Sequence, residues 1–422
     1  MQKLFQFIQT KQIQKNKLTD MKFALIKERK SPPDRRVVFS PAELTKVKKQ
    51  FQEAEFKVES SDIRVFSDKD YRAKGIDVVN DVSDCDVLLG VKEVPIENLI
   101  PNKTYFFFSH TIKKQPYNRK LLKAILEKNI ELYDHETIVN KQGFRLIGFG
   151  FYAGIVGTYN GFRAWGLKFK SFNLPKAGTL LHQEDLINQL NTITIPNIKI
   201  LLTGSGKASN GAQEMLEGMH IKQVSVDDYL NKAFNEPVYC KIDVLDYNKR
   251  KDGQVIEDVF DFFNNPQEYD SNFMRFAKVT DYYIAAHFYG NGAPYLYTRN
   301  DVKSPDFNIK VVADVSCDVD GPVATTLRAS TIEDPIYGYD PQTESEVDYR
   351  ESNAITVMAV DNLPCELPKD ASEGFGDMFL QHVIPAFFNG DKDGVLARAK
   401  MTENGKLTER FSYLQEYVDG KE

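Results

Sequence analysis

The sequence has little cysteine or histidine and no long apolar run. Its four cysteines are scattered without a C-x-x-C pair, which excludes a disulfide-rich secreted scaffold and favours a reducing, cytoplasmic setting. Its six histidines show neither H-x-x-x-H nor H-E-x-x-H spacing, so we expect no metal. No apolar run reaches the roughly 18 residues of a membrane span, so we also expect no membrane partner.

An excess of positive charge is also lacking. Lys and Arg number 54 against 60 Asp and Glu, and a net charge of -6 argues against a nucleic-acid partner. With 42% hydrophobic residues in 422, the chain has enough apolar material for two or three domains of about 150 residues each. Residues 1–20 lack the apolar core of a signal peptide, and a strand-like segment follows at Met21. We therefore expect residues 1–20 to be an N-terminal extension.

The first part of the chain alternates between short apolar runs and helical patterns. Ser40 and Pro41 form a good helix start, and this helix should continue to Gln50. A further helix is expected over 119–128, and strands over 22–27, 56–58, 87–91, 104–108 and 131–133. Alternation of this kind is typical of an α/β domain with a mostly parallel sheet.

A glycine-rich stretch over 148–169 separates this part from a second one. Gly154, Gly157 and Gly161 would share one face of a helix and allow another helix to approach closely. The second part begins at Ile198 with a strand, a glycine turn, a helix and a strand that ends near Asp227. Further strands are expected over 282–287, 309–315 and 354–360, a polar loop over 340–352, and a packing helix within 372–388.

The glycine turn is the strongest local signal. Gly204, Ser205 and Gly206 lie between the strand and the helix, where backbone N–H groups and the helix N-terminus can receive a pyrophosphate. The pattern departs from G-x-G-x-x-G, because Ser209 holds the third position and Gly211 follows two residues later. It predicts a dinucleotide site, with an ordinary turn between strand and helix as the alternative.

Acidic residues follow two of the predicted strands. Asp227, 23 residues beyond the first glycine of the turn, is a candidate to bind the ribose 2′-hydroxyl and to favour NAD(H) over NADP(H). Asp228 competes for this role, and an ordinary solvated aspartate is the alternative. Asp314, Asp318 and Asp320 group after the strand over 309–315. Without EF-hand spacing, they suggest a strand-end acid facing a ligand rather than a calcium site.

Two basic side chains end neighbouring apolar runs. Lys92 follows VLLGV and His110 follows TYFFFS, so two adjacent parallel strands would deliver both residues to the same sheet edge. A lysine and a histidine together suit proton transfer. Solvated strand-end residues are the alternative. Arg36 and Arg145 could bind carboxylates bidentately, although surface salt bridges explain them equally well and Arg35 could replace Arg36.

Several blocks together resemble one family. The blocks are LLGVKEVP, KTYFFFSHTIKKQ, LYDHETIV, RLIGFGFYAGIVG, LLTGSGKASNGAQ, ADVSCDVDGP and DNLPCELPKDASEGFGDMF. With these blocks the chain resembles the lysine-forming saccharopine dehydrogenases, or lysine 2-oxoglutarate reductases, over about residues 22–422. The wider group includes alanine dehydrogenase and nicotinamide nucleotide transhydrogenase.

The resemblance implies an α/β fold of two Rossmann-like domains with mostly parallel sheets flanking an active-site cleft. Residues 21–150 plus about 325–422 would form the substrate domain, and about 151–324 the dinucleotide-binding domain. It implies an oxidoreductase of lysine metabolism that condenses lysine with 2-oxoglutarate reversibly, using NAD(H) or NADP(H). An alanine-dehydrogenase-like enzyme and a non-catalytic nucleotide-binding protein are the alternatives, and the oligomeric state stays open.

The resemblance also implies roles for single residues. Lys92 and His110 would be the acid/base pair, and Asp318 would lie at the cofactor. Substrate contacts would come from Arg36, Glu93, Glu136 and Arg145. The expected partners are therefore small molecules: lysine, 2-oxoglutarate and saccharopine.

Overall fold

The computed structural model describes residues 21–256, 258–290 and 292–421, so the predicted extension over 1–20 lies outside the described residues. The chain divides into two compact units. The first unit combines the part before Gly150 with the part after Leu367, and the second is Gly150–Leu367. Among the helices of the described ranges, none is long and apolar enough to cross a membrane.

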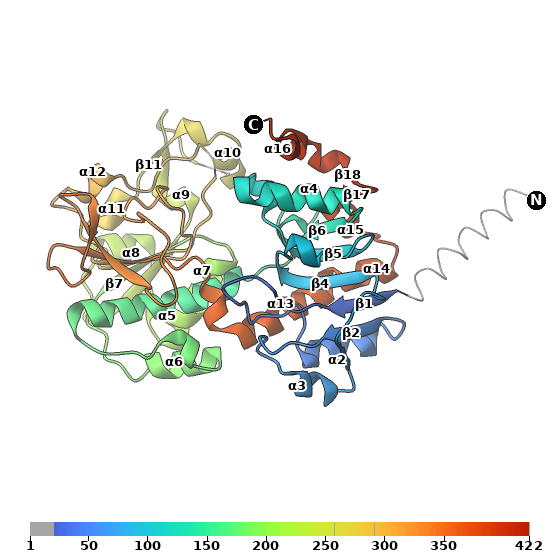
Figure 1. Ribbon diagram of the computed structural model, residues 1–422. Helices are drawn as coiled ribbons and strands as arrows, with labels where there is room; N and C mark the ends of the chain where they lie inside the picture. Colours follow the sequence, from blue (N-terminus) through green and yellow to red (C-terminus); the bar gives the residue numbers. More distant parts are fainter. Residues whose placement is uncertain (1–20, 257, 291, 422) are drawn as a thin grey trace, which may run out of the picture. The chain divides into compact units, whose positions relative to one another are not determined.

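The first unit is built on a six-stranded sheet in the order β3-β2-β1-β4-β5-β6, with every neighbouring pair parallel. Its strands are β1 (Lys22–Leu25), β2 (Glu55–Glu59), β3 (Asp77–Val79), β4 (Val87–Lys92), β5 (Thr104–Phe108) and β6 (Glu131–Asp134). Figure 1 shows these strands with the C-terminal helices around them. The order is that of a Rossmann sheet, in which ligands bind where the strand order reverses, here between β1 and β4.

Helices cover both faces of this sheet. On one face, Phe107 packs with Leu122 of α4 and with Phe411 and Tyr417 near the C-terminus. On the other face, Phe106 makes ring contacts with Phe379 of α13. The predicted helix start is confirmed, because the Ser40 hydroxyl accepts the first free N–H groups of α2. The helices are α2 (Pro41–Gln50), α3 (Asp68–Arg72), α4 (Arg119–Glu127), α13 (Pro368–His382), α14 (Ile384–Phe388), α15 (Val395–Ala399) and α16 (Gln415–Asp419).

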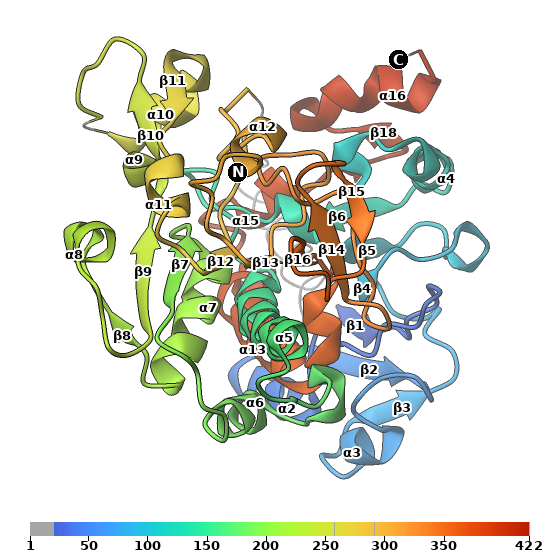
Figure 2. The ribbon, with the colours of Figure 1, turned by 90° about the vertical axis from the view of Figure 1, so that its left-hand side faces the viewer.

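The second unit contains an eight-stranded sheet in the order β15-β14-β16-β13-β12-β7-β9-β8. The six strands from β16 to β8 are parallel, whereas β14 pairs antiparallel with both of its neighbours, β16 and β15. Figure 2 shows β9, β7, β12, β13 and β16 side by side. Its strands are β7 (Lys199–Thr203), β8 (Lys222–Gln223), β9 (Val238–Ile242), β12 (Tyr282–Ala285), β13 (Val311–Asp314), β14 (Ile336–Asp340), β15 (Ser345–Val347) and β16 (Ile355–Met358).

Residues 325–367 belong to the second unit, whereas the sequence suggested that the chain returns to the first domain at about 325. The reason is hydrogen bonding. β16 pairs with β13 on one side and with β14 on the other, so this segment completes the second sheet. The predicted loop over 340–352 also contains β15, whose exposed polar residues carry no strand pattern. The chain returns to the first unit at Pro368.

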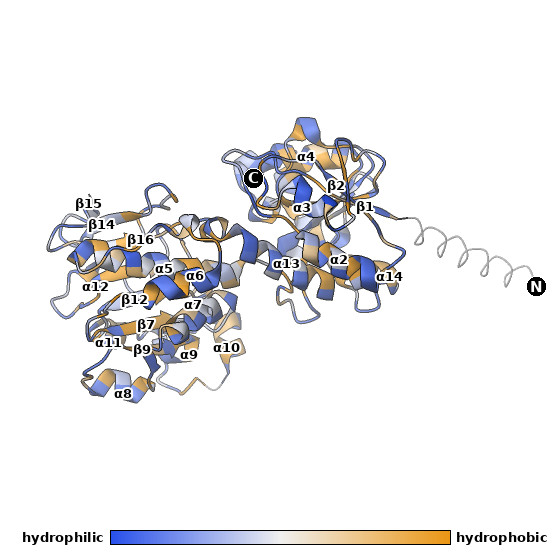
Figure 3. Ribbon diagram, turned by 90° about the horizontal axis from the view of Figure 1, so that it is seen from below, coloured by the Kyte–Doolittle hydropathy of each residue, from blue (hydrophilic) through white to orange (hydrophobic). Residues whose placement is uncertain are grey.

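The glycine-rich helix α5 (Gly150–Phe169) packs tightly, but only one of the three glycines predicted to admit another helix does so. A Cβ at Gly154 would lie 1.9 Å from the backbone oxygen of Ala208 in α7 (Lys207–Gly218). The other two glycines face the sheet, where a Cβ at Gly161 would lie 1.8 Å from the Tyr282 hydroxyl. Figure 3 shows hydrophobic residues along β7 and β12. Buried side chains of these strands and of α5 belong to the same hydrophobic cluster.

The remaining elements are short and lie outside the six-stranded and eight-stranded sheets. They include the antiparallel pair β10 (Asn248–Arg250) and β11 (Tyr269–Ser271), and the pair β17 (Thr402–Glu403) and β18 (Lys406–Leu407). The further helices are α6 (Gln183–Leu190), α8 (Val226–Asn231), α9 (Val244–Tyr247), α10 (Val259–Asn264), α11 (Met274–Ala277) and α12 (Arg299–Val302).

Candidate active site

The carboxyl ends of β4, β5 and β6 gather polar side chains in the first unit. Lys92 is the last residue of β4 and is paired in register with Phe108, the last residue of β5. His110 follows two residues later. The predicted adjacency of the two strands is therefore confirmed. His110 has a φ of 55°, a left-handed conformation that is uncommon for residues other than glycine and that collects at functional sites.

Asp134 holds this turn together. The carboxylate at the end of β6 accepts the N–H groups of Ser109 at 2.9 Å, His110 at 3.0 Å and Glu136 at 2.7 Å. Burial raises the pKa of Asp134, as does the nearby Glu136 charge, while the bond from the Ser109 hydroxyl lowers it. Sequence reasoning missed Asp134, although its position at a strand end is the same signal that identified Lys92 and His110.

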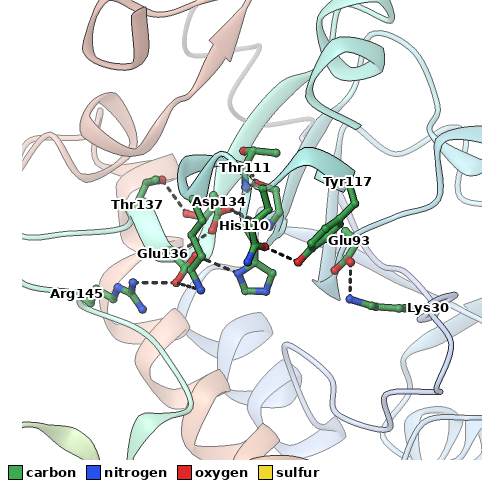
Figure 4. A network of polar contacts seen from close by, with 12 residues as sticks. Lys30, Glu93, His110, Thr111, Tyr117, Asp134, Glu136, Thr137 and Arg145 are labelled. Carbon is green, nitrogen blue, oxygen red and sulfur yellow. Dashed lines mark hydrogen bonds and ion pairs between the residues drawn. The ribbon is translucent and has the colours of Figure 1, made fainter. Parts of the chain in front are cut away.

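Glu136 is the centre of a basic cluster in the first unit (Figure 4). Its carboxylate lies 3.1 Å from Nδ1 of His110, 2.9 Å from the Arg145 guanidinium and 3.7 Å from Nζ of Lys113. Burial favours the neutral acid, but the His110 hydrogen bond and the Arg145 and Lys113 charges win and lower the pKa of Glu136 to about 2. Glu136 is 7% exposed, whereas the Arg145 and Lys113 side chains are about half exposed. They can therefore meet a ligand.

The other predicted substrate residues pair elsewhere in the first unit. Glu93 accepts a hydrogen bond from Nζ of Lys30 at 2.5 Å, while its Oε2 is buried without a hydrogen-bond partner among the described residues. Arg36 is buried, makes two side-chain bonds to Asp34 at 3.0 and 2.6 Å, and lies over the Phe149 ring. Burial tends to raise the pKa of Asp34, but the Arg36 charge and hydrogen bonds lower it. The structure thus gathers His110, Glu136 and Arg145, and gives Glu93 and Arg36 separate partners.

The glycine turn of the second unit lies between β7 and α7, as predicted. Gly204 has a φ of +105°, and a Cβ there would lie 2.6 Å from the backbone oxygen of Ala286, so a side chain is excluded. The Ser209 hydroxyl donates to the Gly204 carbonyl at 2.7 Å and ties the helix to the turn. Gly211 serves helix packing instead, since its Cβ would lie 1.9 Å from the backbone oxygen of Phe151.

The start of α7 fits a dinucleotide pyrophosphate. Gly206 is the N-cap residue of α7 and caps the helix with no side-chain hydrogen bond. A Cβ built on Gly206 would meet no atom within 4 Å, and Ser205 beside it is exposed. Unsatisfied N–H groups and the positive end of the helix dipole attract a phosphate anion.

The prediction that a strand ends at Asp227 is wrong. β8 ends at Gln223, and Asp227 lies in the first turn of α8, because Ser225 caps that helix. On the side of the sheet that ends in β8, the strand beside β7 is β9, which ends at Ile242. The Gly204 N–H donates to the Ile242 carbonyl at 2.8 Å. Asp243 therefore takes the position next to the glycine turn that the sequence assigned to Asp227.

Asp318 is exposed in the turn after β13. The fully buried acid of this segment is Asp314, which accepts hydrogen bonds from the Ser316 and Thr326 hydroxyls, both at 2.6 Å. Burial raises the pKa of Asp314 above its ordinary value, although these hydrogen bonds act in the opposite direction. Within residues 21–256, 258–290 and 292–421, no group of three or more His, Cys, Asp or Glu residues is arranged to bind a metal.

Two family models match this chain. Residues 24–156 match "Alanine dehydrogenase/PNT, N-terminal domain", and residues 186–410 match "Alanine dehydrogenase/PNT, C-terminal domain". The chain belongs to the alanine dehydrogenase/PNT family. Solved structures agree with this fold: an L-alanine dehydrogenase aligns with a TM-score of 0.60 at 16% identity, covering 94% of this chain and 99% of that one. A transhydrogenase from Sinorhizobium meliloti aligns with a TM-score of 0.55 at 14% identity, covering 91% and 98%.

The chain is also similar to a semialdehyde synthase and to a saccharopine dehydrogenase. It is 29% identical to the mitochondrial alpha-aminoadipic semialdehyde synthase of Rattus norvegicus, over 86% of this chain and 44% of that protein. It is 22% identical to the saccharopine dehydrogenase (NAD(+), L-lysine-forming) of Yarrowia lipolytica, over 78% and 82%. The chain thus spans less than half the length of the synthases and most of the length of the dehydrogenase.

Proposed function

We propose that this protein is a nicotinamide-dependent oxidoreductase of the saccharopine dehydrogenase (L-lysine-forming) type. It would join the ε-amine of lysine to 2-oxoglutarate by reductive condensation, or run the reverse reaction. The observation that carries the proposal is the cluster in which Glu136 holds His110, Arg145 and Lys113 at the ends of β5 and β6. Family membership and the names of the relatives support it.

The cluster suits a dicarboxylate substrate. Arg145 and Lys113 each form an ion pair with Glu136, and about half of each basic side chain is exposed. Their remaining N–H groups can therefore bind 2-oxoglutarate carboxylates. The local charge is positive although the whole chain carries -6. No described residue donates a hydrogen bond to Oε2 of Glu93, so this oxygen offers an acceptor of the kind that an amino group needs.

The chemistry requires proton transfer at two points. The amine nitrogen attacks the 2-oxo carbon, and transfer of one proton from nitrogen to oxygen gives a carbinolamine. The carbinol oxygen then takes up a second proton and leaves as water, while the nitrogen loses its other proton and a neutral imine remains. Lys92 and His110 are our candidates for this acid/base work, because neighbouring strands bring both to one edge of the sheet. Addition of a hydride to the imine carbon and of a proton to its nitrogen then gives the secondary amine.

The N-terminus of α7 with Gly204, Gly206 and Ser209 would hold the cofactor. A reduced nicotinamide bound there supplies the hydride. Asp243 beside the turn is our candidate for the ribose 2′-hydroxyl, and its negative charge would repel a 2′-phosphate. We therefore propose a preference for NAD(H) over NADP(H).

A cofactor-oxidation assay tests the proposal. Purified protein is given NADH or NADPH with lysine and 2-oxoglutarate, and the product is identified by mass spectrometry. We expect saccharopine only when both substrates are present. Oxidation with pyruvate and ammonia instead would indicate an alanine-dehydrogenase-like enzyme, and cofactor binding without turnover of any amine and oxo acid would contradict the proposed activity.

Two variants test the acid/base assignment. Lys92→Met and His110→Gln should each lower kcat by roughly 10²–10⁴-fold, the usual contribution of a positioned acid or base. Lys120→Met on α4 and His220→Gln, both at exposed positions, are matched controls that should keep the wild-type rate. Wild-type rates in both site variants would remove Lys92 and His110 from the mechanism.

A further inference from the structure

The strand that carries Lys92 contains a β-bulge just before it. Leu89 of β4 is in register with Phe106 of β5, but Lys92 is in register with Phe108. Three steps along β4 therefore match two along β5, and the extra residue lies at Gly90 or Val91. A bulge changes the direction in which the following side chains point and disrupts the local ladder of hydrogen bonds.

Glu28 satisfies the backbone donors on one side of this bulge. It follows β1, the strand next to β4, and is 8% exposed. One carboxylate oxygen accepts the N–H of Val91 at 2.7 Å, and the other accepts the N–H of Lys92 at 2.8 Å. A single buried side chain thus fixes the backbone of Lys92 itself and of the residue before it.

His135 satisfies the acceptor on the other side. Its Nε2 lies 2.8 Å from the Gly90 carbonyl oxygen, so this nitrogen carries the hydrogen and donates it. The ring is fully buried and contacts Phe108, Phe375 and Phe379. Burial lowers the pKa of His135 to about 4, so the ring is neutral at ordinary pH.

Gly90 supplies the carbonyl oxygen that His135 bonds. A Cβ there would lie 3.0 Å from Cδ1 of Ile26, a tight contact, and 3.6 Å from Oε1 of Glu28, an ordinary one. Together, Glu28, Gly90 and His135 form the bulge clamp. Its members come from the ends of β1, β4 and β6.

We infer that Glu28 and His135 are positioning residues that hold the bulge at the end of β4 and thereby aim Lys92 for proton transfer. The inference rests on the proposed role of Lys92. Neither side chain needs to touch a substrate, since each acts through the backbone of the strand. Their loss should therefore change the chemical step rather than substrate binding.

Steady-state kinetics of Glu28→Gln and His135→Phe test the inference. Each should lower kcat roughly 10–100-fold, the usual effect of misplacing a reacting group by about 1 Å, with KM for the substrates nearly unchanged. The pH profile of kcat should also move. His135→Gln, which keeps an N–H donor, should retain more activity than His135→Phe. The control is Glu43→Gln, because Glu43 is as buried as Glu28 but lies on α2.

A second measurement separates this inference from the proposed function. If the wild-type protein turns over no amine and oxo acid, the function fails, but the clamp can still be tested by NMR titration of ¹³C-labelled lysines. The Lys92 signal, assigned with Lys92→Met, should shift its midpoint by about 0.5 unit or more in both clamp variants and not in Glu43→Gln. An unchanged Lys92 titration and unchanged kcat, losses confined to KM, or equal losses in the control would each overturn the inference. If His135→Phe does not fold, Glu28→Gln and His135→Gln decide it.

Discussion

Replacing Glu136 by Gln should make the first unit less stable at neutral pH. It should also remove the part of the pH dependence of stability that comes from the Glu136 charge. The side chain is almost fully buried. Its carboxylate lies 3.1 Å from His110, and its charge is matched by Arg145 at 2.9 Å and Lys113 at 3.7 Å. Gln has nearly the same shape but carries no charge. The variant therefore reports what the negative charge contributes to folding.

The magnitude follows from the pKa of Glu136, which is lowered from 4.5 to about 2 in the folded protein. A difference of about 2.5 units corresponds to about 3 kcal/mol of stability at pH 7. Because the folded-state pKa is the lower one, this stability is present above pH 4.5 and is lost as the pH falls towards 2. At pH 3 less than half of the 3 kcal/mol should remain.

The assay compares urea unfolding of the wild type and Glu136→Gln at pH 7, 5, 4 and 3. Hydrogen exchange of peptides from β5 and β6 assigns the effect to the first unit. The stability difference should be nearly constant from pH 7 to 5 and should shrink below pH 4.5. Glu53→Gln, at an exposed position, is the control. A difference that is independent of pH, or that grows on acidification, would refute the charge-pairing argument.

Three further predictions follow from other parts of the molecule. Asp243→Ala should weaken NADH binding more than NADPH binding, whereas Asp227→Ala should leave the cofactor preference unchanged. Titration calorimetry with both cofactors measures this. The opposite pattern would assign the ribose contact to Asp227. Gly154→Ala should lower the unfolding free energy by about 1–3 kcal/mol, because the new methyl group would lie 1.9 Å from a backbone oxygen of α7. Gly150→Ala, with 3.5 Å to its nearest neighbour, should cost less in the same denaturation experiment. Burial raises the pKa of Glu28 from 4.5 to about 8, so the contribution of Glu28 to stability is fully present below pH 4.5 and is lost as the pH rises through 8. The stability of Glu28→Gln relative to the wild type should therefore rise between pH 4.5 and 8. A stability difference that does not change over this range would contradict the assignment.

Much of the local structure could be read from the sequence. The helix from Pro41 to Gln50 and the strand TYFFF were predicted at the residues where they occur, because a helix cap and an apolar run are local signals. Close packing at the glycines of α5 was also predictable, but only Gly154 admits the neighbouring helix, whereas Gly157 and Gly161 face the sheet. Lys92 and His110 were found because both lie at the ends of apolar runs.

Other features depended on contacts between distant segments. The position of Asp227 was misjudged because sequence order suggests that β8 lies beside β7, whereas β9 occupies that place. The polar edge strand β15 and the return at Pro368 were missed because pairing with β14 and β16 defines them. No spacing in the sequence indicates that Asp134 receives two N–H groups of the turn after β5 and one of the turn after β6.

The sequence by itself determined the α/β class, the strand ends that carry Lys92 and His110, and the glycine turn at Gly204, because each follows from the order of neighbouring residues. Tertiary structure alone decided which side chains meet. Glu136 joins His110 and Arg145 because β5 and β6 are neighbours, and Glu28 and His135 reach the Lys92 strand from β1 and β6. Such contacts depend on strand order and register, which arise only when the whole sheet assembles.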